Sequence, residues 1–516
     1  MQAESRPGRA AIAAGNEQTA AVGERLALEG GNAVDIAVGA TLAATLCEML
    51  MCSLGGSGFL MLRLESGACE LIEGADAMPG KGRAAAAAPP TQREAHLPYG
   101  DGITVRVGHG TVAVPGLLAA LCCAHRRHGR LPFQEVMAPA LELARDGWRC
   151  APIMSRWLEM TGSHIFDRQP ASRRCLLPDG RTPRPGELFR VPGLEGTYEA
   201  IAREGARAFY EGDLAASFVR EMELHGGLVT RRDLASYEAA VRAPLRLPSA
   251  GFTLALNPPP AVGGSAVGAL IGLLEVGGGA PAQGAARAEL HARAQAYVLG
   301  LRERELARED FGEHAARALL SSQVLARHSA ALRSEHTTHL SVATADGSSV
   351  AVSMSMGYGA GVTIPDTGVP CNNSAGEPEL NPRGFGAAPA GARLISNMAP
   401  TVAWHADGRS LALGSPGASR ITTAIAQTWA RYALEGCSME EAVAAPRLHV
   451  EQWEDGPRAQ CEPGIDSARL HAAFRVRPFE QPDMFFGGVQ LVGHEPDGTL
   501  HAVADPRRDG DARIVD

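Results

Sequence analysis

The segment THLSVATADGSSVAVSMSM, residues 338–356, constrains the fold more than any other part of this sequence. Apolar and polar residues alternate on both sides of Asp346-Gly347, which predicts an antiparallel hairpin with one face on a core. With Asp346 and Gly347 as the two turn residues, Thr337 lies opposite Met356 and Thr338 lies opposite Ser355. We therefore expect the Ser355 hydroxyl of the return strand diagonally beside Thr337, within side-chain reach.

Helices and strands are expected on both sides of this hairpin. The run EQTAAVGERLALEGG has apolar residues at helical spacing and ends at Gly30-Gly31, and Asn32 is placed to cap a helix over Ala33–Leu50, with Asp35 in its first turn. Two strands are expected around Ser66-Gly67. Residues 80–101 are of low complexity and are expected to form an exposed loop or short linker.

The rest of the chain mixes the same two kinds of element. Residues 115–305 give mostly helical signals, whereas 410–414 predict a strand, 415–419 a tight loop and 420–436 a helix. Strand-rich and helix-rich stretches alternate without regular βαβ units. This favours an α+β fold, with sheets sandwiched between helix layers, over a doubly wound sheet.

Composition excludes several classes of protein. The 516 residues include 48 Lys and Arg against 57 Asp and Glu, so the net charge of −9 argues against nucleic acid as a partner. The N-terminal residues lack the apolar run of an export signal, and the apolar stretch 36–54 contains Glu48, which suits a buried helix better than a membrane span. Ten cysteines without a Cys-x-x-Cys pair suggest reduced thiols. We expect a cytoplasmic protein that is not attached to a membrane.

The catalytic motifs that are easiest to find are missing from the sequence, which contains no Gly-x-Ser-x-Gly elbow, phosphate-binding Gly-x-x-x-x-Gly-Lys loop or His-Glu-x-x-His zinc pair. Thr337, at the mouth of the hairpin, is a candidate nucleophile if a base lies beside its hydroxyl. Cleavage before Thr337 would free its α-amine to act as that base. Taken alone, the Thr-Thr pair indicates only ordinary strand propensity.

The loop SPGAS, residues 415–419, is the second candidate element. Gly417 and Ala418 stand where a helix begins, so their backbone N–H groups can approach and stabilise an oxyanion. A glycine turn needed only for close packing would have the same sequence.

Together these elements resemble the γ-glutamyltranspeptidases of the N-terminal-nucleophile hydrolase superfamily. The resemblance extends over nearly the whole chain and rests on blocks in family order: GGNAVDIAV (30–38), LGGSGFLM (54–61), TVAVPGLLAAL (111–121), LELARDG (141–147), FYEGDLA (209–215), GGLVTRRDLASY (226–237), PPPAVGG (258–264), TTHLSV (337–342), SNMAPT (396–401), GSPGASRITT (414–423) and APRLH (445–449).

The resemblance implies a four-layer αββα sandwich made as one precursor. That precursor is expected to cut itself between His336 and Thr337 into a large subunit, 1–336, and a small subunit, 337–516, which stay associated. Thr337 is then the nucleophile, Ser355 matches a position that hydrogen-bonds it, and Gly417 and Ala418 match the paired glycines of the oxyanion hole. No metal or organic cofactor is implied.

The substrate-binding positions depart from the family pattern. Ala75 stands where the family has the arginine that pairs with the glutamyl α-carboxylate, and Gly357 stands where it has asparagine. Ser374 replaces the usual amide or carboxylate, and Glu377 matches the aspartate that binds the α-amine. The family's Ser-Ser-Met reads Ser396-Asn397-Met398, preceded by Arg393.

The expected function is therefore an amidohydrolase or acyltransferase for a small-molecule amide or acyl substrate, with non-γ-glutamyl specificity. Two enzymatic alternatives remain open. The first is a true γ-glutamyl hydrolase or transpeptidase acting on glutathione-like substrates, in which Glu377 takes the α-amine and Arg83 or Arg393 supplies the missing charge. The second is a C–C bond hydrolase of an antibiotic pathway. An unprocessed structural relative is the non-enzymatic alternative.

Overall fold

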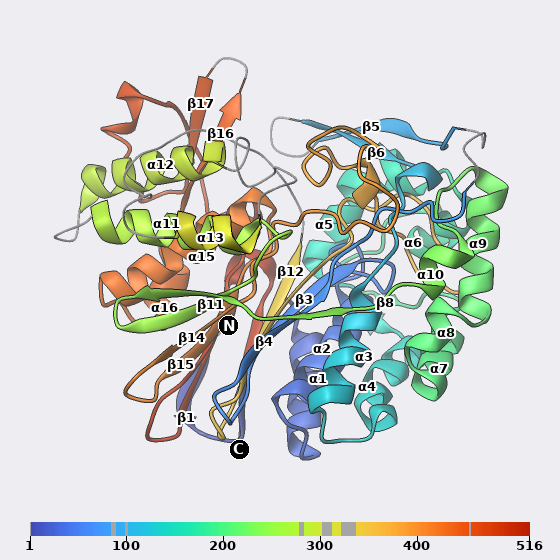
Figure 1. The fold of residues 1–516 in the computed structure, drawn as a ribbon, viewed down its shortest axis with the longest axis horizontal. Helices are drawn as coiled ribbons and strands as arrows, with labels where there is room; N and C mark the ends of the chain where they lie inside the picture. Colours follow the sequence, from blue (N-terminus) through green and yellow to red (C-terminus); the bar gives the residue numbers. More distant parts are fainter. Residues whose placement is uncertain are drawn as a thin grey trace.

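The fold is built around two seven-stranded sheets that stack face to face, as seen in a computed structural model (Figure 1) that describes residues 2–83, 89–98, 102–277, 283–301, 312–320, 337–453 and 456–516. Sheet A has the order β1 (Gln2–Pro7), β20 (Thr499–Ala504), β19 (Gln490–His494), β15 (Ser410–Gly414), β14 (Thr401–His405), β11 (Phe252–Leu256), β10 (Leu245–Ser249). Sheet B has the order β21 (Asp511–Val515), β2 (Ala10–Ala14), β12 (Thr338–Thr344), β13 (Ser349–Ser355), β3 (Ser57–Arg63), β4 (Cys69–Gly74), β9 (Ala240–Arg242). Every pairing within the two sheets is antiparallel.

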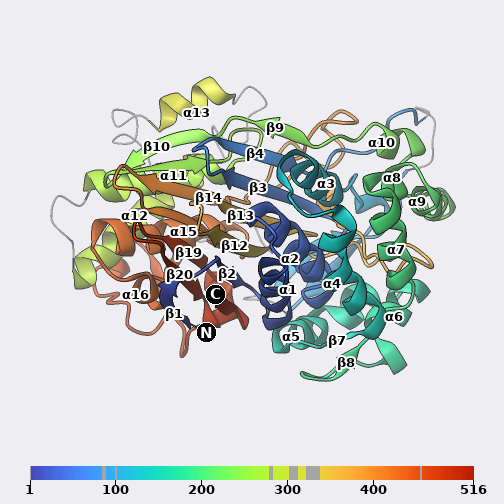
Figure 2. The ribbon, with the colours of Figure 1, turned by 90° about the horizontal axis from the view of Figure 1, so that it is seen from below.

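Helices cover both outer faces of this pair of sheets (Figure 2). The outer face of sheet B packs against α1 (Glu17–Leu28), α2 (Ala33–Cys47) and α3 (Leu117–His128), and α4 (Phe133–Asp146) packs in turn on α2. The outer face of sheet A packs against α11 (Gly263–Gly277), α13 (Glu313–Leu319), α15 (Ser419–Trp429) and α16 (Met439–Ala444), and α12 (Gly284–Leu301) packs in turn on α11. The expected four-layer αββα sandwich is thus confirmed.

Smaller elements surround the sandwich. They are α5 (Pro152–Thr161), α6 (Pro170–Leu176), α7 (Leu194–Glu204), α8 (Ala206–Tyr210), α9 (Asp213–His225), α10 (Arg231–Ala235), the hairpin of β5 (Arg93–Leu97) and β6 (Ile103–Val107), the short pair β7 (Trp148–Arg149) and β8 (Leu188–Phe189), and the sheet of β16 (Leu448–Trp453), β17 (Gly456–Cys461) and β18 (Arg475–Pro478).

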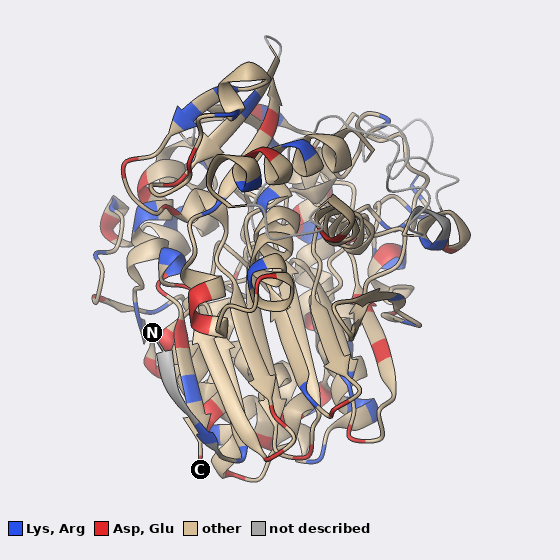
Figure 3. Cartoon of the chain, turned by 90° about the vertical axis from the view of Figure 1, so that its left-hand side faces the viewer, with Lys and Arg blue, Asp and Glu red and all other residues tan. Residues whose placement is uncertain are grey.

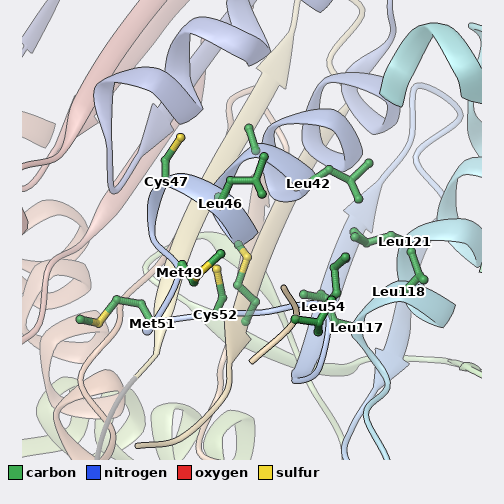
Figure 4. Packing of buried hydrophobic residues seen from close by; sticks show 14 of the residues in the cluster. Leu42, Leu46, Cys47, Met49, Met51, Cys52, Leu54, Leu117, Leu118 and Leu121 are labelled. Atoms are coloured by element: carbon green, nitrogen blue, oxygen red, sulfur yellow. The ribbon is translucent and has the colours of Figure 1, made fainter. Parts of the chain in front are cut away.

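Two apolar cores hold the layers together. One lies between sheet B and its helices, where Leu42 of α2 and Leu118 and Leu121 of α3 are buried in the same cluster (Figure 4). The other fills the space between the sheets and extends to α11 and α15. The central strands carry few charged residues along their length, and Figure 3 shows Asp, Glu, Lys and Arg mainly at strand ends and on the helices. No helix in the described parts of the chain has the length and apolar character needed to cross a membrane.

The local predictions for the first two helices are confirmed. The Asn32 side chain accepts hydrogen bonds from the backbone of Val34 and Asp35, and the Asp35 carboxylate accepts one from the Asn32 N–H, so α2 begins with a capping box. α2 ends at Cys47, three residues earlier than expected, and every one of its residues is buried. The stretch that contains Glu48 is therefore a core helix and the turn after it.

Two other segments differ from expectation. Residues 80–101 do not form only a loop, because Arg93–Leu97 pairs with β6; residues 84–88 and 99–101 lie outside the described part. The mostly helical region also contains the hairpin of β10 and β11, whose Ala250 and Gly251 have φ of 49° and 82°. This is the mirror-image two-residue turn that suits twisted strands.

The register of the β12–β13 hairpin differs from the prediction by one residue. Thr338 pairs with Met354 and Ala343 with Ser349. The connection has three residues, not two, because only Gly347 adopts a positive φ, 80°, while the Asp346 carboxylate accepts hydrogen bonds from the Ser348 N–H and the Thr344 hydroxyl. The same register carried one residue further places Thr337 directly opposite Ser355.

Candidate active site

The residues singled out from the sequence meet in one pocket at the end of β12 and β13. Its lining consists of Ser57, Ala75, Asp76, Thr337, Ser355, Gly357, Ser374, Glu377, Leu380, Leu394, Ile395, Ser396, Asn397, Met398 and Ala418. Nine of the predicted site residues are among them: Thr337, Ser355, Ala418, Ala75, Gly357, Ser374, Glu377, Ser396 and Asn397. Gly417 and Arg393 do not line the pocket, and His336 lies outside the described residues.

Thr337 immediately precedes β12, in the middle of sheet B, and its residue surface is only 2% exposed. Ser355, the last residue of β13, accepts a hydrogen bond at its Oγ from the Gly357 N–H at 3.0 Å. The Ser57 hydroxyl, on the other neighbouring strand, lies 3.5 Å from the Ser355 carbonyl oxygen. Three adjacent strands of sheet B therefore each bring a hydroxyl-bearing residue to this pocket.

The loop between β15 and α15 forms another wall. Gly417 has φ of 112°, and a Cβ there would lie 3.1 Å from the Gly487 Cα, so the loop needs glycine at this position. Ala418 caps α15 with φ of 63° and ψ of −118°, a backbone region that non-glycine residues rarely adopt. The predicted helix over 420–436 is α15 followed by a π-helical turn at Ala430–Leu434.

Buried polar contacts hold this strained loop in place. The Ser415 hydroxyl donates to the Pro416 carbonyl at 2.8 Å and accepts from the Gly488 N–H at 3.0 Å. Arg420, which is 1% exposed, donates to the Phe485 carbonyl at 3.1 Å and stacks over the Phe485 ring. The N-terminal N–H groups of α15 carry positive partial charge, so the loop offers a fixed site for an oxyanion.

Two buried histidines lie near the site but not in it. Burial lowers the pKa of His339 to about 3, so the ring is neutral, with its nitrogens 2.8 Å from the Ser353 hydroxyl and 3.0 Å from the Ser341 hydroxyl. Burial also lowers the pKa of His449, which contacts the Ser419 and Thr423 hydroxyls of α15. Among the described residues that line the pocket, none is His, Lys or Arg.

Asp76 is a pocket residue that the sequence did not identify as functional. It is 3% exposed, and its Oδ2 accepts a hydrogen bond from the Ser374 hydroxyl at 2.6 Å. Burial raises the pKa of Asp76 to about 7, although the Ser374 and Ser57 hydroxyls and the charge of Arg393 act in the opposite direction. This carboxyl group therefore changes charge near neutral pH.

Arg393 supports the pocket from behind. Its guanidinium donates to the Ala75 carbonyl at 3.1 Å and to the Glu238 carbonyl, and it stacks 4.1 Å from the Tyr237 ring centroid. Its Nε also lies 4.0 Å from a carboxylate oxygen of Glu73. The charge of Arg393 is thus directed at backbone and ring atoms behind the wall, and Arg83 does not line the pocket either.

Glu377 uses the space that Gly357 leaves open. A Cβ on Gly357, whose φ is 62°, would lie 1.8 Å from the Glu377 Oε1 and 2.4 Å from the Asn373 Oδ1. The Asn373 Oδ1 accepts the Tyr358 N–H at 2.9 Å, and the Asn381 amide donates to the Glu377 carbonyl at 2.9 Å. The carboxylate of Glu377 therefore reaches the pocket only because residue 357 has no side chain.

A second buried acid, Glu48, lies behind the start of β12. It accepts hydrogen bonds from the Thr338 hydroxyl at 2.5 Å and the Thr19 hydroxyl at 2.9 Å, and burial raises its pKa. Its one sequence signal is that it is the only charged residue in an apolar run. Asp76 and Ser57 had no such signal.

No group of three His, Cys, Asp or Glu side chains in the described ranges is placed to hold a metal ion.

Comparison with known proteins agrees with this geometry. The family model for γ-glutamyltranspeptidase matches residues 19–515. This chain belongs to the γ-glutamyltranspeptidase family. It is 31% identical to an acylase ACY 1 proenzyme of Pseudomonas sp. (strain SE83), over 97% of this chain and 93% of that protein. It is 28% identical to a glutathione hydrolase proenzyme of Escherichia coli (strain K12), over 94% and 88%.

The structural comparison supports the fold of this family member. A cephalosporin acylase from Bacillus halodurans superposes with a TM-score of 0.77, covering 100% of this chain and 98% of the other at 22% identity. The sequence relatives thus include both acylases and glutathione hydrolases. Membership of the γ-glutamyltranspeptidase family establishes the fold and the class of chemistry. It does not identify the acyl group of the substrate, which depends on the residues of the pocket.

Proposed function

We propose that this chain is a self-processing N-terminal-threonine amidohydrolase or acyltransferase. It cuts itself between His336 and Thr337 into residues 1–336 and 337–516, and then cleaves an amide or acyl bond of a small molecule. One observation carries the proposal: Thr337 lines a pocket with Ser355 and Ala418, and the described lining has no histidine or lysine, the usual bases for a hydroxyl nucleophile. The α-amine of Thr337 itself fills that role once it is freed.

Self-cleavage begins with attack of the Thr337 hydroxyl oxygen on the carbonyl carbon of residue 336. The C–N bond breaks, the departing nitrogen takes a proton and becomes the α-amine of Thr337, and an ester joins the two parts. Water then hydrolyses the ester, which leaves a carboxylate on residue 336 and restores the Thr337 hydroxyl. No cofactor enters this sequence of steps.

Turnover uses the same groups on an external substrate. The Thr337 hydroxyl attacks the acyl carbon while its proton passes to the α-amine, and the backbone N–H groups at Gly417 and Ala418 stabilise the oxyanion. With its oxygen held by the Gly357 N–H, the Ser355 O–H is directed to the nucleophile across the strand pair. The α-amine returns the proton to the leaving amine, and water or an amine then takes the acyl group from Thr337.

The pocket argues against a γ-glutamyl acyl group. The two titratable side chains in the described lining are the acids Asp76 and Glu377, and Ala75 offers no guanidinium. A charge-assisted hydrogen bond contributes roughly 1.5–3 kcal/mol, so losing it costs about ten- to a hundredfold in binding a carboxylate. We therefore propose an acyl group without a carboxylate at this position. A γ-glutamyl activity is the alternative, because Glu377 lines the pocket and its carboxylate can bind the α-amine of a glutamyl group.

Processing is tested by denaturing electrophoresis and intact-mass measurement of the purified protein. We expect chains of residues 1–336 and 337–516, with Thr337 at a new N-terminus. Thr337→Ala should leave one uncut and inactive chain, whereas Thr337→Ser, which keeps a hydroxyl, should still cut. An uncut wild-type chain that is fully active would contradict the proposal.

Acyl specificity is tested with two 4-nitroanilides that differ in charge. We expect the butyryl anilide to show a higher kcat/KM than the γ-glutamyl anilide, with and without glycylglycine as acceptor. A γ-glutamyl anilide preferred by tenfold or more would establish the alternative. Thr337→Ala serves as the blank for both substrates, so hydrolysis that persists in it arises from a contaminant.

A further inference from the structure

A second and larger cavity, of about 600 Å³, lies at the end of the molecule that carries β5, β6, α6 and α9 (Figure 1). Its lining is Thr91, Gln92, Arg93, Val107, Gly108, His109, Ile165, Arg168, Gln169, Pro170, Ala171, Arg174, Glu221, His225, Ala360, Gly361, Val362 and Pro365. None of these residues lines the catalytic pocket. We call this cavity the arginine groove. Its volume falls within the range typical of small-molecule sites.

Three arginines give the groove a positive rim. Arg168 and Arg174 are exposed, and no carboxylate of the described residues forms an ion pair with either. Arg93 donates to the His164 carbonyl at 2.6 Å, and burial together with the nearby charge of Arg168 lowers its pKa. Like charges held close together without a counter-ion favour binding of an anion.

The one carboxylate in the lining is already engaged. Glu221 is 6% exposed, and its Oε1 lies 2.8 Å from the His109 Nε2 and 2.7 Å from the Gln169 Nε2. Burial opposes ionisation of Glu221, but the hydrogen bonds from His109 and Gln169 leave its pKa lowered. Glu221 therefore neutralises part of the groove's interior, and among the described residues it forms no ion pair with the rim arginines.

The remaining wall is apolar. Val107, Ile165, Ala171 and Val362 are buried apolar residues of the lining, and Pro365, which also lines the groove, is partly buried. The lining of the groove thus combines apolar residues with guanidinium groups. The matching ligand has an apolar body that ends in a carboxylate or another organic anion.

We propose that the arginine groove binds an amphipathic organic acid, at a site separate from the catalytic pocket. One loop contributes residues to the lining of both cavities. Ala360, Gly361 and Val362 line the groove, whereas Gly357, a few residues earlier in the same loop, lines the catalytic pocket. Gln169 ties this loop down by donating to the Thr363 carbonyl at 3.0 Å and accepting the Thr363 N–H at 2.8 Å.

The test compares two fluorescent probes that share one ring system. Dansylglycine ends in a carboxylate, and dansylcadaverine ends in an ammonium group. We expect saturable binding of dansylglycine that is at least about tenfold tighter than that of dansylcadaverine and that weakens as sodium chloride is added. Equal affinities for the two probes, or no saturable binding of dansylglycine, would overturn the proposal.

Variants locate the binding. Arg168→Glu combined with Arg174→Glu should weaken dansylglycine binding about tenfold or more. Arg173→Glu is the control, because Arg173 lies next to Arg174 on α6, pairs with Asp167 at 3.3 Å and does not line the groove, so binding should change by less than about twofold. These three arginines are exposed, so the variants keep the core intact. Equal effects of the two changes would refute the location.

The catalytic pocket provides the last control. Thr337→Ala removes the nucleophile but touches nothing in the groove, so it should leave dansylglycine binding unchanged. Loss of binding in Thr337→Ala would assign the probe to the catalytic pocket and overturn the proposal.

Discussion

Replacing Asp76 with asparagine should remove a pH-dependent loss of stability. Burial raises the pKa of this carboxyl group to about 7 from its ordinary 3.8. Each factor of ten in proton affinity corresponds to ~1.4 kcal/mol, so keeping Asp76 ionised in the folded chain costs on the order of 4 kcal/mol. Asparagine carries no charge, and its Oδ1 can still accept the hydrogen bond that Ser374 donates.

The direction of the effect follows from proton binding. Between about pH 4 and pH 7 the folded chain holds the Asp76 proton, whereas the unfolded chain has released it. The unfolded state thus binds fewer protons in this window, so the free energy of unfolding falls as pH rises. Relative to its parent, Asp76→Asn should gain ~1.4 kcal/mol per pH unit from about pH 5 to pH 7 and then level off.

The measurement is urea unfolding followed by tryptophan fluorescence from pH 5 to pH 8. Thr337→Ala is the background, because an uncut chain unfolds as one molecule. Glu223→Gln, a change at an exposed carboxylate of α9, is the reference variant and should show no such trend. A difference between Asp76→Asn and its parent that stays constant over this range would refute the burial argument.

Three glycine and alanine positions give further predictions. Ala418→Gly should relieve backbone strain and raise the free energy of unfolding by about 1 kcal/mol, with turnover kept within a few fold; a lower urea midpoint would contradict this. Gly414→Ala should destabilise by roughly 1–3 kcal/mol, because the new Cβ would lie 2.2 Å from the His339 Cε1; adding His339→Ala should recover much of that loss, and no recovery would exclude the clash as its cause. Gly357→Ala should displace the Glu377 carboxylate and lower kcat/KM as much as Glu377→Ala does. The double variant should have a kcat/KM no lower than that of either single variant. Additive decreases in kcat/KM would show that the two positions act independently.

Local signals predicted the parts of the fold that depend on neighbouring residues. The Asn32 cap and the Asp35 contact to it are made within one helical turn, so the sequence contains the whole interaction. The types of turn were harder to predict from the sequence, although turns are local structures too. Asp346-Gly347 indicated a two-residue turn, but the Asp346 side chain stabilises a three-residue loop, while Ala250 adopts the positive φ expected of asparagine or glycine.

The site was predictable only in part, because its residues come from distant segments. The hairpin and the 415–419 loop indicate Thr337, Ser355 and Ala418 as candidates, the family resemblance implies their roles, and the three residues line one pocket together. Asp76 is not indicated as functional by the sequence. Its surroundings are made by Ser374, which is 298 residues away in the chain, so no local pattern shows that it is buried and shares a proton-sensitive contact.

The strand order has a consequence for the two proposed subunits. Strands from before and after residue 337 alternate in both sheets, meeting at β21–β2, β2–β12 and β13–β3 in sheet B and at β1–β20 and β14–β11 in sheet A. Separating the two subunits would break the backbone hydrogen bonds at each of these strand pairs. It would also expose unpaired strand edges, which are prone to aggregation. After cleavage the two subunits therefore share both sheets, and they can separate only if the sheets unfold.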